Sequence, residues 1–137
     1  MRKILRGICL VFLISHNGLA GEGTITVDTL AHTGLSWDGS RLPAYPKETP
    51  EITILRITIP AGAELPKHRH PVINAGVLLS GELTVVTEDD HLLHVKAGDA
   101  IVEVVGKWHY GKNEGKIPAV ILVFYAGRPA APVTTKK

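Results

Sequence analysis

The sequence has a single cysteine, Cys9, among its 137 residues. Because Cys9 lies in an apolar segment near the N-terminus, the chain beyond residue 20 contains no thiol. A disulfide framework, a thiolate metal ligand and a cysteine nucleophile are therefore excluded from that part of the chain. A metal bound there must be held by His, Asp, Glu, Asn or water.

The sequence also lacks a strong excess of either charge, with 15 Lys and Arg against 13 Asp and Glu. Arg2, Lys3 and Arg6 are three of the basic residues, which leaves 12 beyond residue 20 against all 13 acidic ones. This near-neutral remainder has no cluster of Lys or Arg. Nothing electrostatic therefore favours nucleic acid as a partner, and we expect none.

The apolar run at the N-terminus is too short to span a bilayer. It covers residues 7–15, whereas a transmembrane helix needs about twenty apolar residues. Basic residues precede the run and the small residues Gly18 and Ala20 follow it, a pattern typical of a cleaved secretory signal peptide. We predict a signal peptide at 1–20, export to the periplasm or the medium, and a mature domain not bound to the membrane. A retained N-terminal anchor or a buried helix is the alternative.

The remaining residues show no helical periodicity and fit one domain. Short segments rich in β-branched residues, separated by turn residues, occur at 24–28, 52–59, 74–80, 82–87, 91–95, 100–105 and 118–126. Such spacing predicts an all-β sandwich or barrel. We expect a strand and a Pro/Gly-rich arm at 21–50, in which Trp37 and Tyr45 pack the loop down or meet a second subunit. A barrel at 51–127 and a frayed tail at 128–137 complete the prediction.

Two histidines are spaced as a strand would space metal ligands. His68 and His70 are two residues apart, so on a strand both imidazoles project from the same face. Pro66 and Pro71 bracket the pair and place it near a strand end, because proline cannot donate to a sheet ladder. Three other histidines are expected at the surface, namely His32, His91 and His94.

Two glycine- and histidine-containing stretches, 62–81 and 98–113, resemble the two motifs of the cupin superfamily. The positions in register are Gly62, His68, His70 and Gly81 in the first motif, and Gly98, Gly106, His109 and Asn113 in the second. Asn74 stands where the first motif has Glu, and Val104 replaces the Pro of the second. The resemblance covers about residues 52–127 and is to a small single-domain cupin. It implies a six-stranded double-stranded β-helix barrel within a jelly roll, a divalent metal inside it, and frequent homodimers.

By the motif match, His68, His70 and His109 would be the metal ligands. Three neutral imidazoles suit a transition metal better than Mg or Ca, which prefer oxygen ligands. Fe, Ni, Zn, Cu and Mn all remain candidates. Three protein ligands leave at least one coordination position open, as catalytic sites do.

Asn74 and Glu103 decide the charge of the expected site. An amide oxygen at position 74 would be a neutral and poorer fourth ligand, which predicts looser metal binding and a preference for anionic substrates. Glu103 is the one charged residue in the apolar segment 100–105. It either faces solvent or points inward, where it could be a fourth ligand, a partner of a ligand or a general base. It is our one candidate for a catalytic residue.

Two functions follow from these expectations. The first is an exported, dioxygenase-like oxidoreductase that uses the metal to act on a small organic anion. The second is a non-catalytic module that binds a metal or small molecule as a sensor or carrier. An empty barrel remains a third possibility if Asn74 abolishes metal affinity. The expected partners are a small-molecule ligand or substrate and a second copy of the chain.

Overall fold

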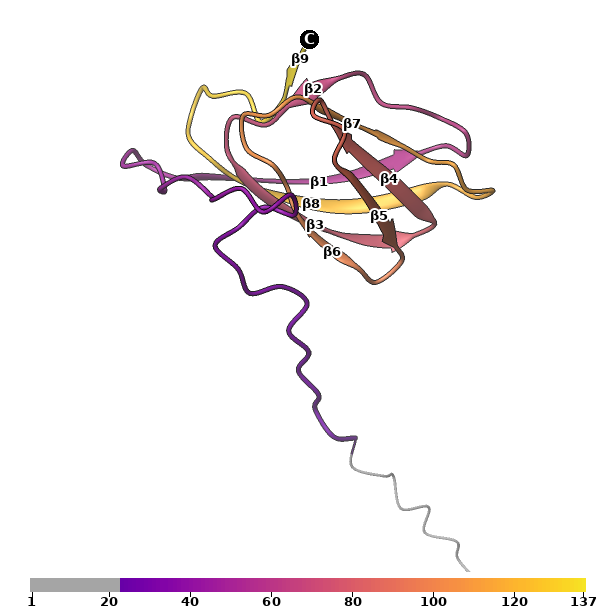
Figure 1. Ribbon diagram of the computed structural model, residues 1–137. Coiled ribbons are helices and arrows are strands. Elements are labelled where there is room, and N and C mark those ends of the chain that lie inside the picture. Colours follow the sequence, from indigo (N-terminus) through magenta and orange to yellow (C-terminus); the bar gives the residue numbers. More distant parts are fainter. Residues whose placement is uncertain (1–22) are drawn as a thin grey trace, which may run out of the picture.

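A computed structural model describes residues 23–137, and every regular element in that range is a strand (Figure 1). The expected signal peptide at 1–20 lies outside the described residues. The strands are β1 (Glu51–Ile59), β2 (His68–Arg69), β3 (Ile73–Ser80), β4 (Glu82–Thr87), β5 (Leu92–Lys96), β6 (Ala100–Val102), β7 (His109–Lys112), β8 (Ala119–Gly127) and β9 (Thr135–Lys136). Residues 23–137 contain no helix able to span a bilayer.

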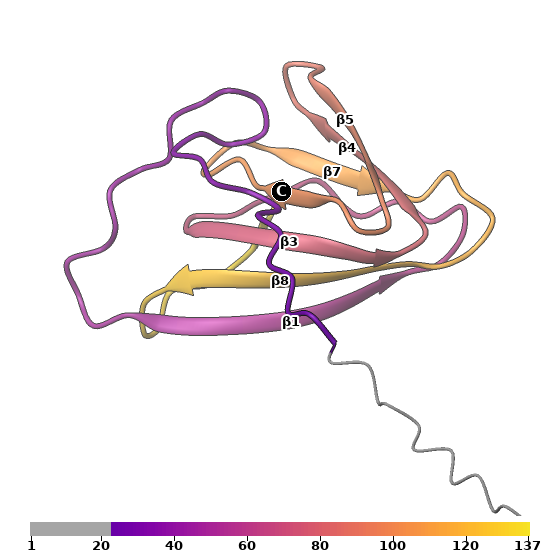
Figure 2. The same cartoon turned by 90° about the horizontal axis from the view of Figure 1, so that it is seen from below.

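The strands form two antiparallel sheets that face each other. One sheet has the order β1-β8-β3-β6 and the other β5-β4-β7-β2-β9, and Figure 2 shows β1, β8 and β3 side by side in the first. Strands distant in the sequence are neighbours in both sheets, as in a jelly roll. The predicted all-β jelly-roll barrel is therefore confirmed.

Strand β8 shows how the sequence produces the core. Its residues alternate between buried and less buried positions along nearly its whole length, and Ile121, Val123 and Tyr125 point inward. This period of two is what a strand requires when one face is covered. Burial of an aliphatic side chain contributes about 1.5–3 kcal/mol, so the pattern fixes which face of β8 meets the opposite sheet.

The strand expected at 24–28 does not form. Residues 23–31 are exposed, and the side chains of Ile25 and Val27 are 91% and 88% accessible. Figure 1 shows this segment running away from both sheets. An alternating sequence becomes a strand only where a partner offers backbone hydrogen bonds, and no strand within residues 23–137 does so here.

The loop that follows is fixed to the barrel by its tryptophan. Trp37 packs against the hydrophobic core, and its backbone N–H donates to the carbonyl of Val102 at 2.9 Å. The hydroxyl of Ser36 donates to the carbonyl of Glu103 at 2.9 Å. Trp37 therefore packs the loop down as predicted, whereas Tyr45 is exposed.

An ion pair between Asp38 and Lys107 holds the same loop, with the two atoms 2.6 Å apart. Burial alone would raise the pKa of Asp38, but hydrogen bonds from Lys107 and Ser40 outweigh it and lower the pKa to about 2. Because the folded-state pKa lies below the ordinary value of 3.8, the stabilisation is complete above about pH 4 and is lost as the pH falls towards 2.

We therefore expect Asp38→Asn to lower the free energy of unfolding by about 1–2 kcal/mol at pH 7 and by almost nothing at pH 2. Urea unfolding at pH 7, 4 and 2 measures the difference between the variant and the wild type. Asp28→Asn is the matched control, because Asp28 lies in the exposed arm and should have no effect. A deficit that is the same at every pH would contradict this explanation.

The C-terminal residues are ordered into the fold, which corrects the frayed tail expected at 128–137. Thr135 pairs with Arg69, so β9 lies beside β2, and Val133 packs against the hydrophobic core. The backbone N–H of Lys137 donates to the carbonyl of Lys67. The physical reason is that β2 would otherwise end its sheet with unpaired backbone groups.

Candidate metal centre

Three histidines meet because β2 and β7 are neighbours. His68 on β2 is directly opposite His109 on β7, and opposite residues of an antiparallel pair project from the same face. His70 follows two residues after His68 and is held by a bridge to Val105 and by the N–H of Gly106. The three ring centroids lie 4.5–5.0 Å apart. The shared face predicted for His68 and His70 is thus present, and His109 joins it.

The backbone fixes which nitrogen each ring presents. In every ring Nδ1 lies within hydrogen-bonding distance of a carbonyl oxygen. The acceptors are Pro66 at 2.7 Å from His68, Val133 at 2.9 Å from His70 and Lys107 at 2.9 Å from His109. A carbonyl can only accept, so each Nδ1 carries the proton and each Nε2 keeps its lone pair. This is how proteins orient histidine ligands of metals.

Burial favours the neutral form of all three imidazoles. Burial lowers the pKa of His68 and His109, and burial together with the two neighbouring imidazoles lowers the pKa of His70 to about 4. A metal binds the neutral form of histidine, so no proton needs to be removed from these rings before binding.

The spacing of the rings fits a transition metal. Their ligand atoms all lie within 4.8 Å of one another, and within residues 23–137 this is the only group of three or more His, Cys, Asp or Glu side chains so arranged. Two imidazole nitrogens about 2.1 Å from one ion lie about 3.4 Å apart in a tetrahedral site, so the most distant pair would close by up to about 1.4 Å when an ion binds. Buried Nε2 of His109 has no hydrogen-bond partner, as expected of a position reserved for an ion.

Glu103 points into the same space, which resolves the question that the sequence leaves open. Only 8% of this residue is exposed, and Oε2 lies 3.8 Å from Nε2 of His109. Oε2 has no hydrogen-bond partner. Burial raises the pKa of the Glu103 carboxyl to about 7 and outweighs the opposing influence of His68, of the Trp37 indole and of the backbone of Val104.

Asn74 also faces the histidines and is almost fully buried. Its Nδ2 donates to the carbonyl of Val72 at 3.2 Å, which directs Oδ1 away from that carbonyl. Oδ1 is buried and has no partner. An acceptor left free beside three lone pairs suits a cation or a donor such as water.

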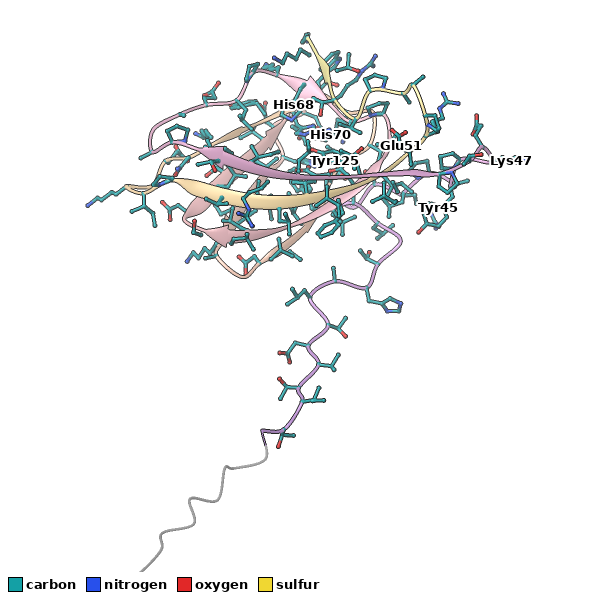
Figure 3. All side chains as sticks on the ribbon, turned by 180° about the vertical axis from the view of Figure 1, so that it is seen from behind. Tyr45, Lys47, Glu51, His68, His70 and Tyr125 are labelled. Atoms are coloured by element: carbon teal, nitrogen blue, oxygen red, sulfur yellow. The ribbon has the colours of Figure 1, made fainter. Side chains whose placement is uncertain are left out.

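These groups line a cavity of about 270 Å³. Most of its wall is aliphatic, formed by Leu55, Ile57, Ile59, Leu65, Leu83, Val85, Ile121 and Val123. The polar part of the wall is concentrated near the histidines, where Figure 3 shows His68 and His70 close to Tyr125. The volume lies below the range of about 300–1,000 Å³ typical of pockets for drug-sized ligands, so the cavity suits a small molecule.

The comparisons with known proteins agree with the fold and the site. A family model for the cupin domain matches residues 55–125, slightly more than half of the chain. The chain belongs to the cupin family. No curated protein matches this cupin.

Three solved structures resemble this cupin over more than half of its length. A conserved protein with a double-stranded beta-helix domain from Klebsiella pneumoniae is 21% identical with a TM-score of 0.55, covering 70% of this chain and 80% of that one. An oxalate oxidase in complex with the substrate analogue glycolate is 26% identical with a TM-score of 0.53, covering 62% and 45%. The DMSP lyase DddQ from Ruegeria pomeroyi is 22% identical with a TM-score of 0.55, covering 63% and 43%. The chain thus spans less than half the length of the two enzymes.

Parts of the cupin's site could not be found from the sequence. Tyr125 lies edge-on to His70 with ring centroids 5.4 Å apart, and the only local sign was its place among inward-facing residues of an apolar strand. Thr134 and Lys136 also line the cavity, and no local pattern marks them. The three histidines expected at the surface, His32, His91 and His94, are exposed.

The C-terminal segment orients one ligand of the cupin's site. Carbonyl oxygen of Val133 is the acceptor for Nδ1 of His70, and the hydroxyl of Thr134 lies 3.2 Å from the same nitrogen. Deletion of residues 133–137 removes both partners and frees the ring to turn. We expect the deletion to weaken metal binding about 10–100-fold, the usual effect of losing a group that orients a ligand.

Competition titration of the purified protein with a coloured chelator measures this loss. Lys137→Ala is the control, because it shortens one side chain and keeps the backbone of β9. A deletion variant that binds metal as tightly as the wild type would show that His70 does not depend on this segment.

Proposed function

We propose that this cupin binds a divalent transition metal through His68, His70 and His109 and acts on a small organic anion as an oxidoreductase, with dioxygen as the oxidant. The observation that carries the proposal is the fixed orientation of three Nε2 lone pairs into one cavity. Three protein ligands leave coordination positions open for a substrate. A bound metal would supply Lewis acidity and, if it is Fe, Mn or Cu, electron transfer.

The charge of the cavity supports an anionic substrate. Lys136 is the only Lys or Arg in the wall among the described residues, and the metal would add positive charge nearby. The oxalate oxidase that resembles this chain was solved with glycolate, a small carboxylate. The aliphatic wall would keep water away from a ligand of this size and strengthen its interaction with both charges.

A non-catalytic binding module is the second candidate. It is favoured by Asn74, which stands where the first cupin motif has Glu and offers a neutral oxygen in place of a carboxylate. A sensor or carrier would use the same three histidines and the same cavity without turnover.

The experiment that separates the two candidates begins with the metal. Protein is purified without added chelator, its metal content is determined by elemental analysis, and oxygen uptake is then followed with oxalate, glycolate, diketones and thiols. About one metal per chain with uptake for one substrate class supports the oxidoreductase. Full loading with Fe, Mn or Cu and no uptake supports the binding module, and no bound metal after loading overturns both.

We also propose that the protein is exported, on the basis of the basic, apolar and small-residue pattern in residues 1–20. N-terminal sequencing of protein recovered from the periplasm or medium tests this. A start near Gly21 supports cleavage of a signal peptide, whereas an intact Met1 contradicts it.

A homodimer remains a proposal as well. Strand β1 ends its sheet, with no partner on its outer side within residues 23–137, and Ile52, Ile54 and Phe124 expose large apolar surfaces. Such an edge is often covered by another chain. Light scattering after gel filtration gives the mass in solution, and a monomer at high concentration would contradict the proposal.

A further inference from the structure

Glu103 and Asn74 are neighbours across two strands. The ladder of β3 and β6 pairs Ala75 with Val102, and the next backbone hydrogen bond joins the N–H of Glu103 to the carbonyl of Asn74 at 3.1 Å. Residues opposite each other in an antiparallel pair project from the same face, with Cβ atoms about 4.5–5.5 Å apart. Glu103 therefore enters the cavity one strand away from the position where cupins of the expected pattern have Glu.

We propose that Glu103 is the carboxylate ligand of this cupin's metal. The carboxylate would then come from the residue that follows β6, and not from position 74 on β3. The proposal rests on the proposed metal site and names a ligand that the motif match does not provide. In this arrangement Asn74 contributes little to metal binding, and its side-chain oxygen is a neutral hydrogen-bond acceptor beside the ion.

Distances support direct binding. Oε2 of Glu103 is 3.8 Å from Nε2 of His109, and both atoms are buried without a hydrogen-bond partner. Two ligand atoms about 2.0–2.2 Å from one ion lie up to about 4.2 Å apart, so these two atoms can share an ion with little movement. A single cation between them would satisfy both.

The surroundings of Glu103 offer no other charge partner. Within residues 23–137 no Lys or Arg forms an ion pair with it, and its backbone is held by Ser36 and by the strand contact to Asn74. A buried carboxylate without a cation is strongly unfavourable.

With Glu103 as a ligand, the metal site has the same net charge as a site with three histidines and the motif's glutamate, although its carboxylate comes from another strand. A divalent ion with Asn74 alone would keep about two positive charges, whereas Glu103 reduces this to about one. The looser binding that Asn74 suggests by itself should therefore not occur.

Titration with Co²⁺ tests the assignment without any assay of activity. Apo protein is titrated by calorimetry and by the visible spectrum of the bound ion, which reports on the atoms that coordinate it. Glu103→Gln is nearly isosteric and is expected to weaken binding at least about 10-fold and to change the spectrum, whereas Asn74→Ala should change affinity less than about 3-fold. The exchange variant Asn74→Glu with Glu103→Gln should recover most of the affinity.

Each outcome has a definite meaning. Unchanged affinity and spectrum in Glu103→Gln would overturn the assignment of this ligand while leaving the three-histidine site intact. A loss in Asn74→Ala as large as that in Glu103→Gln would overturn it too, because position 74 would then be the ligand. If the wild type binds no Co²⁺, the metal site itself fails, and this assignment fails with it. Thermal unfolding of the apo variants confirms that each has folded.

Discussion

Replacement of His109 by alanine is expected to lower the affinity for Co²⁺ or Zn²⁺ by at least about 100-fold. Loss of a group that only orients a ligand typically costs 10–100-fold, and loss of the ligand itself should cost more. His109 is almost fully buried, and its Nε2 lies 3.8 Å from Oε2 of Glu103. Competition with a chelator of known affinity measures the change.

Two further variants make the result interpretable. His91→Ala removes an exposed imidazole outside the site and should leave the affinity unchanged. His68→Ala removes a ligand from a partly exposed position, so it should lose metal with less effect on folding than His109→Ala. Retention of stoichiometric metal by both His68→Ala and His109→Ala would mean that the metal is bound elsewhere.

The largest effect on stability is expected from Gly81→Ala. Gly81 joins β3 to β4 with a φ of +74°, and a Cβ atom there would lie 2.7 Å from the carbonyl oxygen of Pro118 and 2.9 Å from Cα of Ala119. Both are backbone atoms at the start of β8, a strand paired on both sides, so they cannot move aside easily. Left-handed backbone costs alanine about 1–2 kcal/mol, and the clash adds about 1–3 kcal/mol, so a total loss of about 2–5 kcal/mol is expected.

Gly98→Ala is the matched control for this prediction. Gly98 also has a positive φ, +96°, but no atom lies within 4 Å of the position where a Cβ would be placed. Only the backbone term applies, so a loss of about 1–2 kcal/mol is expected. Urea unfolding with a common m-value gives both numbers. Equal losses in the two variants would show that β8 yields to the added methyl group.

The sequence predicts the histidine pair well because its geometry is local. Two residues separated by one position on a strand must share a face, so the common direction of His68 and His70 needs no knowledge of the fold. Convergence with His109 depends on the pairing of β2 with β7, whose residues are about forty positions apart. The residues alone could not predict that pairing. The expectation that His109 joins His68 and His70 came from the resemblance to the cupin superfamily.

The features that the sequence predicts poorly all depend on distant partners. Residues 24–28 have the composition of a strand but meet no sheet edge, whereas Thr135 and Lys136 in a short tail become a strand because β2 lies beside them. The side on which Glu103 lies was undecidable for another reason. Parity with His109 could not settle it, because a turn at Gly106 and Lys107 separates the two residues. In the structure the alternation of β6 continues from Ile101 to Glu103 and ends at Val104, which is also buried.

The position of β9 beside β2 determines at which end of the chain a purification tag can be attached. A polyhistidine tag fused after Lys137 would begin beside β2 and bring additional imidazoles to the entrance of the cavity, where they would compete for the ion and falsify its stoichiometry. The arm that includes Gly23 leads away from both sheets (Figure 1), so a histidine-free purification handle attached on that side would stay clear of the cavity.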